Sequence, residues 1–277
     1  MKMLFDSHTH LNNDTITPEE REALISDIEA SDLLYVMDVG FDLPSSMQAV
    51  DDATANPWCY AAVGVHPHDT DDMDEDVLTL IKGLCSKEKV MAIGEIGLDY
   101  HYDFSEREAQ RKWFRRQIQL ANELKMPIII HSREADEDTM NILKEEGTFS
   151  KERQSWFPKR KDPDGEELPD SRVLIHCFSS SREIARQYVK LGATIGICGP
   201  VTYKNNRRGK EVVIDTPIEF LVVETDAPYL TPEPFRGKKN KALYVEYTAR
   251  KVAELKEMDY EEVAKITCQN AKKFFGI

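Results

Sequence analysis

Residues 127 to 133, Pro-Ile-Ile-Ile-His-Ser-Arg, carry the pattern that decides the fold. Three consecutive isoleucines make a short β-branched run, which is typical of a strand buried on both faces of a parallel sheet. The run ends at His131, so an ionisable side chain lies directly beyond an apolar strand. The same layout, an apolar run followed by a polar segment, recurs on both sides of this segment along the chain.

Eight such apolar runs alternate with amphipathic stretches. The predicted strands are Met3–Asp6, Leu33–Val39, Tyr60–Val65, Val90–Gly94, Pro127–Ile130, Val173–Ile175, Ala193–Ile197 and Phe220–Glu224. The predicted helices between them include Pro18–Ala30, Ser45–Asn56, Glu106–Leu124, Ser132–Glu146, Ser181–Leu191 and Ala242–Lys256. Alternation predicts a parallel sheet, and eight repeats favour closure into a (β/α)8 TIM barrel over an open doubly wound sheet. A length of 277 residues suits one such domain, spanning residues 1–277.

Two further features complete the predicted organisation. The helical segments Asp259–Thr267 and Gln269–Phe275 are expected to cover the outside or one end of the barrel. Residues 148–171, between the fifth and sixth strands, form a charged insertion that is too short for a second domain. A surface excursion is the simpler interpretation of this insertion, and a flap that contacts substrate is the alternative.

Ionisable side chains follow five of the eight predicted strands. They are His8 and His10 after the first strand, Glu95 after the fourth, His131 after the fifth, His176 after the sixth and Asp226 after the eighth. Each one alone could be a hydrogen-bonded structural histidine or a helix-capping acid. In a barrel of this type, however, the C-terminal strand ends surround the active site, so all six groups are expected to face one mouth. Together they predict a metal centre.

The types of ligand limit which metal ions the site can bind. Imidazole and carboxylate without thiolate suit Zn, Mn, Fe, Co or Ni, and Mg when more ligands are water. Six protein ligands exceed the needs of one tetrahedral zinc, which favours two divalent ions bridged by a carboxylate. Glu95 is the expected bridge, because the fourth strand lies between the first strand and the fifth and sixth. Mg, Mn and Zn all remain open.

Three other histidines receive separate predictions. His66 and His68 lie in Gly-Val-His-Pro-His after the third strand. His66 is interpreted as a contact to a substrate phosphate or leaving group, with support of a metal ligand as the alternative. His68 is expected to face solvent, and His101 is expected to take no part in the site.

Composition restricts the class of protein. Hydrophobic residues make up 41% of the chain and charged residues 31%, and no apolar run of about 20 residues exists to span a bilayer. The N-terminal stretch lacks a signal-peptide layout, so a cytoplasmic location is expected. A net charge of -14 argues against a large non-specific nucleic-acid surface. The five scattered cysteines indicate neither a disulfide framework nor a thiolate zinc site, and are interpreted as small buried hydrophobes.

The ordered motifs resemble the TatD family of metal-dependent deoxyribonucleases. The resemblance rests on Asp-Ser-His-Thr-His, Gly-Val-His-Pro-His, Gly-Glu-Ile-Gly-Leu-Asp-Tyr, Ile-Ile-His-Ser-Arg-Glu-Ala, His-Cys-Phe-Ser, Gly-Pro-Val-Thr-Tyr-Lys-Asn and Glu-Thr-Asp-Ala-Pro-Tyr-Leu, in order along the whole chain. It implies an amidohydrolase-type TIM barrel with one ion near His8, His10, Glu95 and Asp226 and a second near Glu95, His131 and His176. It also implies DNA cleavage, often by Mg-dependent 3′-5′ exonucleases, or deacylation of D-aminoacyl-tRNA.

The predicted reaction is therefore metal-assisted hydrolysis of a phosphodiester, with DNA as the expected partner. Asp226 is the candidate base, Glu95 and His66 join it as catalytic residues, and Glu224 is expected to support the ligands. Arg133, Lys204 and Arg236 are the candidate substrate contacts, although a solvated surface explains each basic residue about equally well. Two basic segments after the seventh and eighth strands, Lys204–Lys210 and Arg236–Lys241, are expected to be loops near the metal site that hold the DNA. Hydrolysis of an ester in aminoacyl-tRNA or of a small carbonyl substrate is the alternative, and a non-catalytic metal-binding protein is a third. The oligomeric state stays open, with a monomer as the default.

Overall fold

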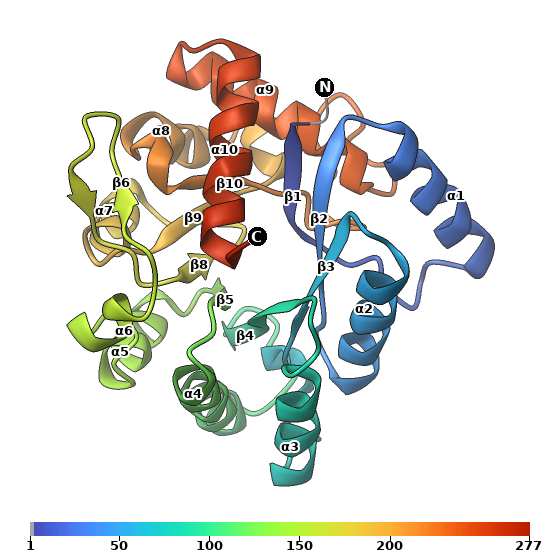
Figure 1. Cartoon of the computed structure of the whole chain (residues 1–277), viewed down its shortest axis with the longest axis vertical. Coiled ribbons are helices and arrows are strands. Elements are labelled where there is room, and N and C mark those ends of the chain that lie inside the picture. The colour runs from blue at the N-terminus through green and yellow to red at the C-terminus, as the bar shows by residue number, and fades with distance from the viewer. Residues whose placement is uncertain (1–2) are drawn as a thin grey trace.

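The computed structural model describes residues 3–277. Residues 1 and 2, which belong to the N-terminal stretch that lacks a signal-peptide layout, lie outside the described residues. Eight strands form one sheet, in which each hydrogen-bonded pair is parallel and the strand order follows the chain. They are β1 (Leu4–Thr9), β2 (Leu33–Val39), β3 (Cys59–Val63), β4 (Val90–Asp99), β5 (Ile128–Arg133), β8 (Val173–Ile175), β9 (Thr194–Ile197) and β10 (Leu221–Val223). Figure 1 shows the strands as a ring surrounded by helices, which confirms the predicted barrel.

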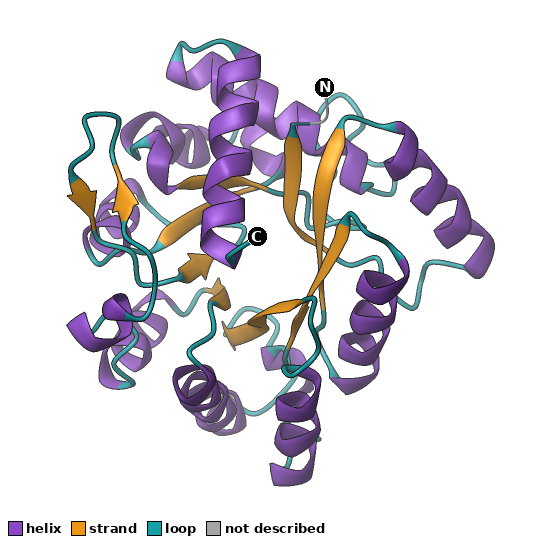
Figure 2. Cartoon of the chain, viewed as in Figure 1, coloured by secondary structure: helices purple, strands orange, loops and turns teal. Residues whose placement is uncertain are grey.

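Helices follow most strands and cover the outside of the ring (Figure 2). The larger ones are α1 (Pro18–Ala30), α2 (Leu43–Ala55), α3 (Glu75–Leu84), α4 (Arg107–Leu124), α5 (Asp136–Glu145), α7 (Arg182–Lys190), α8 (Arg207–Asp215), α9 (Val245–Lys256) and α10 (Tyr260–Phe275). Local sequence fixes several starts. In α1, Thr17 accepts the backbone N–H of Glu20 and the Glu20 side chain accepts that of Thr17, which satisfies two otherwise unpaired donors. No helix within residues 3–277 is long and apolar enough to cross a membrane.

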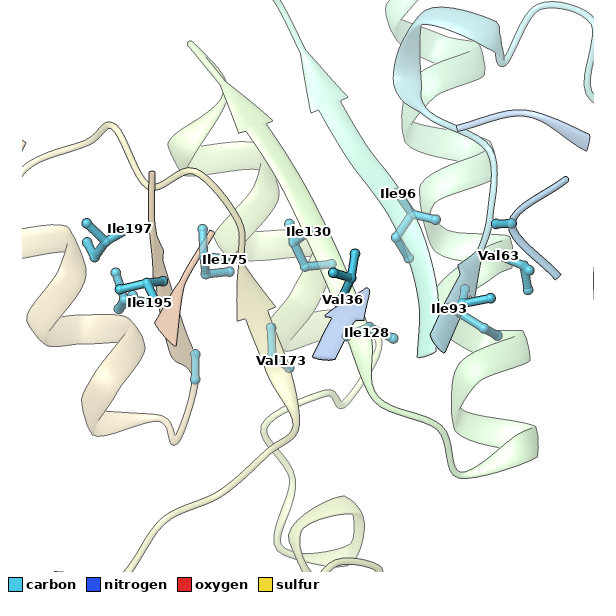
Figure 3. Packing of buried hydrophobic residues seen from close by; sticks show 14 of the residues in the cluster. Val36, Val63, Ile93, Ile96, Ile128, Ile130, Val173, Ile175, Ile195 and Ile197 are labelled. Atoms are coloured by element: carbon cyan, nitrogen blue, oxygen red, sulfur yellow. The ribbon is translucent and has the colours of Figure 1, made fainter. Parts of the chain in front are cut away.

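Two apolar layers occupy opposite faces of the strands. Ile128 and Ile130 of β5 belong to the larger layer, which packs between the sheet and the surrounding helices (Figure 3). Ile129 belongs to a smaller layer inside the barrel, together with Leu174 of β8 and Val222 of β10. Helix α10 lies across one end of the barrel and adds Phe274 to this inner layer (Figure 1). Strand alternation thus determines which side chains enter the barrel.

The first and last strands meet at a seam that side chains help to close. Asp6 on β1 accepts the backbone N–H of Thr225 at 2.8 Å and its hydroxyl at 2.6 Å. The backbone N–H of Asp226 donates to the carbonyl oxygen of His8 at 2.9 Å. These bonds hold β1 and the segment after β10 in one fixed relation.

The C-terminal and basic segments differ from the sequence prediction. The two predicted C-terminal helices are one continuous helix, α10. Cys268, at the expected break, is buried, and the hydroxyl group of Thr267 donates a hydrogen bond to the carbonyl oxygen of Val263 one turn earlier. A basic segment expected to be a loop contains the start of α8, because Asn206 caps that helix by accepting the N–H of Gly209. The structure also contains α3, which was not among the predicted ranges. This helix begins after the capping residue Asp74, whose side chain accepts the backbone N–H of Val77.

The insertion contains short elements of its own. They are α6 (Lys151–Ser155) and the antiparallel pair β6 (Arg160–Lys161) and β7 (Glu167–Leu168). Arg153 of α6 is fully buried and its guanidinium donates to oxygen atoms of Asn122, Met126 and Ser171. The segment is therefore anchored to the barrel by a buried side chain, in addition to being a surface excursion.

Candidate metal centre

Strand alternation brings the predicted groups to the C-terminal mouth of the barrel. His131 and His176 each lie two residues beyond an inner-layer residue, Ile129 and Leu174 respectively. Because side chains two apart on a strand share a face, both imidazoles continue the inner layer toward the mouth. The structure gathers all six predicted ligands there, in three groups whose ligand atoms lie within 4.8 Å of one another. The groups are His8 with Glu95 and His176, His8 with His10 and Asp226, and His66 with Glu95 and His131.

Glu95 lies at the centre of this cluster and is almost fully buried. Its Oε2 atom is 3.4 Å from Nε2 of His8 and 3.8 Å from Nε2 of His10. Its Oε1 atom is 2.8 Å from Nδ1 of His131 and 3.2 Å from Nε2 of His176. The two oxygens of one carboxylate therefore face two different pairs of histidines.

Asp226 lies on the same side as the His8 and His10 pair. Its Oδ1 atom is 3.4 Å from Nε2 of His10 and 3.8 Å from Nε2 of His8, and those two nitrogens are 3.3 Å apart. Asp226 has a backbone φ of 57°, in the left-handed region that non-glycine residues seldom adopt. Its backbone bond to His8 fixes this conformation and turns the carboxylate toward the imidazoles.

Hydrogen bonds on the outer side of the rings orient two imidazoles. Nδ1 of His10 is 2.7 Å from the carbonyl oxygen of Val39, and Nδ1 of His176 is 3.1 Å from Oε1 of Glu224. A carbonyl oxygen can only accept, so Nδ1 of His10 carries a proton, and a neutral ring then presents an unprotonated Nε2 to the cluster. Glu224 is fully buried and supports His176 in the way the sequence predicted.

Asp99 is a site residue that the sequence reading missed. Its Oδ2 atom is 3.1 Å from Nε2 of His131, which leaves Nδ1 of that ring facing Glu95. The predicted fourth strand stopped at Gly94, whereas β4 continues to Asp99. Asp99 lies four residues after Glu95, a spacing that could have indicated it, because alternate residues of a strand share a face.

His66 and His68 adopt different roles from each other. The ring of His66 is buried, and its Nδ1 accepts the backbone N–H of His68 at 3.1 Å. The proton of a neutral His66 is therefore on Nε2, which lies 3.7 Å from Oε1 of Glu95. The prediction that His68 faces solvent is wrong: the short helix Pro67–Asp69 turns its ring inward, and Nε2 lies 3.0 Å from Oδ2 of Asp99.

His101 does lie apart from the cluster. It is exposed, and its Nδ1 is 2.8 Å from a carboxylate oxygen of Glu134.

Charges in the cluster stabilise one another. Burial alone would raise the pKa of Glu95. The neighbouring imidazoles, among which His176 has the largest effect, instead lower that pKa well below its usual value. Burial likewise opposes ionisation of Asp226, but the nearby imidazoles of His10 and His176 lower its pKa below the usual value. Burial lowers the pKa of His66 well below its usual value, and the charge of His131 lowers it further. At neutral pH both acids are therefore carboxylates, and His66 is a neutral donor.

Two of the cysteines depart from the sequence prediction. Cys177 and Cys198 are joined by a disulfide, with Cα atoms 5.4 Å apart. They are 21 residues apart in the chain, but each follows one of the paired strands β8 and β9, so the barrel brings them together. The other three cysteines are free and at least partly buried, as expected.

The predicted substrate contacts lie around the mouth rather than within the cluster. Arg133, Lys204 and Arg236 are all exposed. The guanidinium of Arg133 lies 4.6 Å from the ring centroid of Tyr102, and that of Arg236 lies 4.3 Å from the ring centroid of Tyr203. Arg133 is the last residue of β5, and Lys204 and Arg236 lie in the connections that follow β9 and β10.

A comparison with known families assigns the chain. Residues 5–276 match the model of the family described as TatD related DNase. The chain belongs to this family. Its relatives in the TatD family include an uncharacterized metal-dependent hydrolase of Bacillus subtilis, YabD, which is 44% identical over 99% of this chain and 100% of its own length.

Other TatD relatives extend the comparison. The 3′-5′ ssDNA/RNA exonuclease TatD of Pantoea ananatis is 32% identical over 99% of this chain and 100% of its own length. The solved structure of YJJV, a TatD homolog from Escherichia coli, has a TM-score of 0.85 at 24% identity and covers 100% of this chain and 99% of that one. The TatD barrel is thus shared over the full described chain.

Proposed function

We propose that this TatD-family protein is a dinuclear metal-dependent hydrolase that cuts phosphodiester bonds in DNA. The observation that carries the proposal is the position of Glu95, whose two oxygens face separate histidine pairs. A carboxylate in this position suits a bridge between two ions, and the proposed ligands are His8, His10 and Asp226 on one side and His131 and His176 on the other. The metal would be Mg, Mn or Zn.

The donor set fits such ions. Outer hydrogen bonds from His10 to Val39 and from His176 to Glu224 leave one nitrogen of each ring directed inward. This arrangement of ring, inward nitrogen and outer acceptor is usual for histidines that bind metals. Divalent ions would supply Lewis acidity, which offsets negative charge on phosphate oxygens and makes water more acidic.

The chain's own groups would move the protons. Asp226 is ionised at neutral pH and its side chain is 13% exposed, compared with 4% for Glu95, so it is the accessible carboxylate that can accept a proton from the attacking water. His66 presents a buried N–H to the same space and would donate a hydrogen bond to a phosphate oxygen or to the leaving group. Arg133, Lys204 and Arg236 would contact the phosphate backbone at the rim.

Nucleic acid as substrate is supported by the family description and by relatives named as nucleases. The family is described as TatD related DNase, and the Pantoea ananatis relative is named a 3′-5′ ssDNA/RNA exonuclease. An acidic chain with a net charge of -14 repels DNA at long range, so binding would depend on the ions and on the basic rim.

The test is a parallel assay of protein reconstituted with Mg²⁺, Mn²⁺ or Zn²⁺. End-labelled single-stranded DNA and D-aminoacyl-tRNA are incubated separately with wild type and with Glu95→Gln, and the metal content of each protein is measured. We expect cleavage of DNA, about two ions per wild-type chain and loss of both in the variant. Cleavage of D-aminoacyl-tRNA without cleavage of DNA, or one ion per chain at saturation, would contradict the proposal.

A further inference from the structure

Two exposed aromatic rings stand beside the metal centre in the loop after β4. Tyr102 is 48% exposed and Phe104 is 67% exposed. Their rings are stacked, with centroids 5.2 Å apart and planes 17° apart. Single exposed apolar residues are ordinary on protein surfaces, but two stacked rings at the edge of a candidate active site present a joint apolar surface to solvent.

Direct contacts connect this pair to the cluster. The ring of Phe104 packs against the ring of His68, with centroids 4.8 Å apart. Nε2 of His68 is 3.0 Å from Oδ2 of Asp99, and the same oxygen is 3.1 Å from Nε2 of His131. A ligand group on Phe104 would therefore lie close to one held at the metal centre.

The charge around the rings suits an anionic polymer. The guanidinium of Arg133 lies over Tyr102, and within residues 3–277 no carboxylate lies within ion-pair distance of it. Of the nearby acids, Asp103 forms an ion pair with Arg107, and Glu134 accepts a hydrogen bond from Nδ1 of His101. Apolar rings combined with a free cation are the features of single-strand nucleic-acid sites, where bases stack on aromatic side chains and cations contact the phosphates.

We infer that Phe104, held by Tyr102 and His68, is a stacking site for an unpaired base of the strand whose phosphodiester lies at the metal centre, with Arg133 contacting an adjacent phosphate. This inference rests on the proposed function. Stacking accepts any base, because every base has a π face, so the site requires a base without reading its identity. It also selects against a paired end, where the base is already stacked within a duplex.

The test uses single-stranded pentanucleotides in which one base at a time is removed to leave an abasic sugar. With wild type, removal of one particular base should raise KM roughly tenfold, since a base stacked on an aromatic side chain contributes on that order to binding. Phe104→Ala should lose this sensitivity, so that the same abasic position changes KM less than about twofold. Phe104→Trp keeps a ring and should retain it. Leu80→Ala, which removes another exposed apolar side chain, 55% exposed and on α3, is the matched control and should behave as wild type.

A binding measurement gives a second result that does not depend on cleavage. A pentanucleotide with 2-aminopurine at the sensitive position and phosphorothioate linkages should lose fluorescence on binding to wild type and to Phe104→Trp, and much less on binding to Phe104→Ala. An equal abasic penalty in wild type and Phe104→Ala, or equal quenching, would overturn the stacking site while leaving DNA cleavage intact. Absence of any cleavage of DNA by wild type would overturn the proposed function and, with it, the stacking site.

Discussion

Buried ionisable groups occur in two regions of this barrel, and they are arranged in opposite ways. In the insertion, the guanidinium of Arg153 donates to three oxygen atoms. Directly after the insertion, the guanidinium of Arg172 donates to Asp170 and to the carbonyl oxygen of Phe274. At the mouth, the inward nitrogens of His8 and His10 face each other and the carboxylates of Glu95 and Asp226. The first region has partners for its donors, whereas the second directs several lone pairs at the same small volume.

The difference separates a structural role from a functional one. Burial lowers the pKa of Arg153 to about 10, which still leaves it charged at neutral pH, and each of its three guanidinium nitrogens donates a hydrogen bond. Such a group fixes a segment in place. Lone pairs of imidazoles and carboxylates that converge on one volume repel each other unless a proton or a metal cation lies between them, so their convergence indicates a cation. Burial of charge is thus common to both regions, and only the geometry of the partners distinguishes them.

Glu95→Gln should have the largest effect on activity. The substitution keeps the shape of the side chain but removes the charge that faces both histidine pairs, so turnover should fall by about a thousandfold or more and metal content should drop. In EDTA, where no metal is bound, the free energy of unfolding of the variant should stay close to that of wild type. Full metal content with near-normal turnover would show that the cluster at the mouth does not have the functional role that distinguishes it from the insertion.

Asp226→Asn tests the proposed base within the same cluster. Turnover should fall roughly a thousandfold, in the range expected for loss of a general base, while the fold is retained. The informative measurement is single-turnover cleavage of DNA with metal content determined on the same sample. A variant that holds both ions and cuts at the wild-type rate would show that Asp226 is not the base.

Arg153→Met should affect stability and leave chemistry alone. It leaves three buried oxygen atoms without their donor, at a cost of about 3 kcal/mol in the free energy of unfolding. Urea unfolding measures this cost, and turnover of a small phosphodiester should match wild type. Arg250→Met is the control, because its exposed pair with Glu246 on α9 should contribute less than about 1 kcal/mol. Equal stabilities of the two variants would contradict the structural role.

Asp99→Asn should have the smallest effect of the four. Asn can still contact His131 but no longer carries the charge that holds its Nε2 proton, so metal affinity should fall about 10- to 100-fold. Isothermal titration with Mn²⁺ measures the change. Glu134→Gln is the control, since it alters a carboxylate on the exposed His101 and should leave the affinity unchanged. A similar loss in both variants would mean that Asp99 does not position the ligand.

The sequence was sufficient to predict the barrel and the six residues at its mouth, because both depend on local patterns. An apolar run ending at His131 or His176 specifies a strand and the direction of the next side chain. Features that depend on tertiary contacts were not predictable in this way. The pairing of Cys177 with Cys198 requires knowing that β8 and β9 are neighbours at matched heights. The inward turn of His68 requires Asp99 as its partner, and Asp99 itself was hidden by ending the fourth strand five residues early.

The seam of the barrel coincides with one half of the proposed metal centre. His8 and His10 belong to the first strand and its end, and Asp226 follows the last strand, so these three groups lie on opposite sides of the junction. An ion bound by them would join the two ends of the sheet, and its binding free energy would add to the stability of the closed ring. Metal occupancy would then report completion of folding: a chain whose last strand has not yet docked lacks the third donor and cannot assemble that half of the centre.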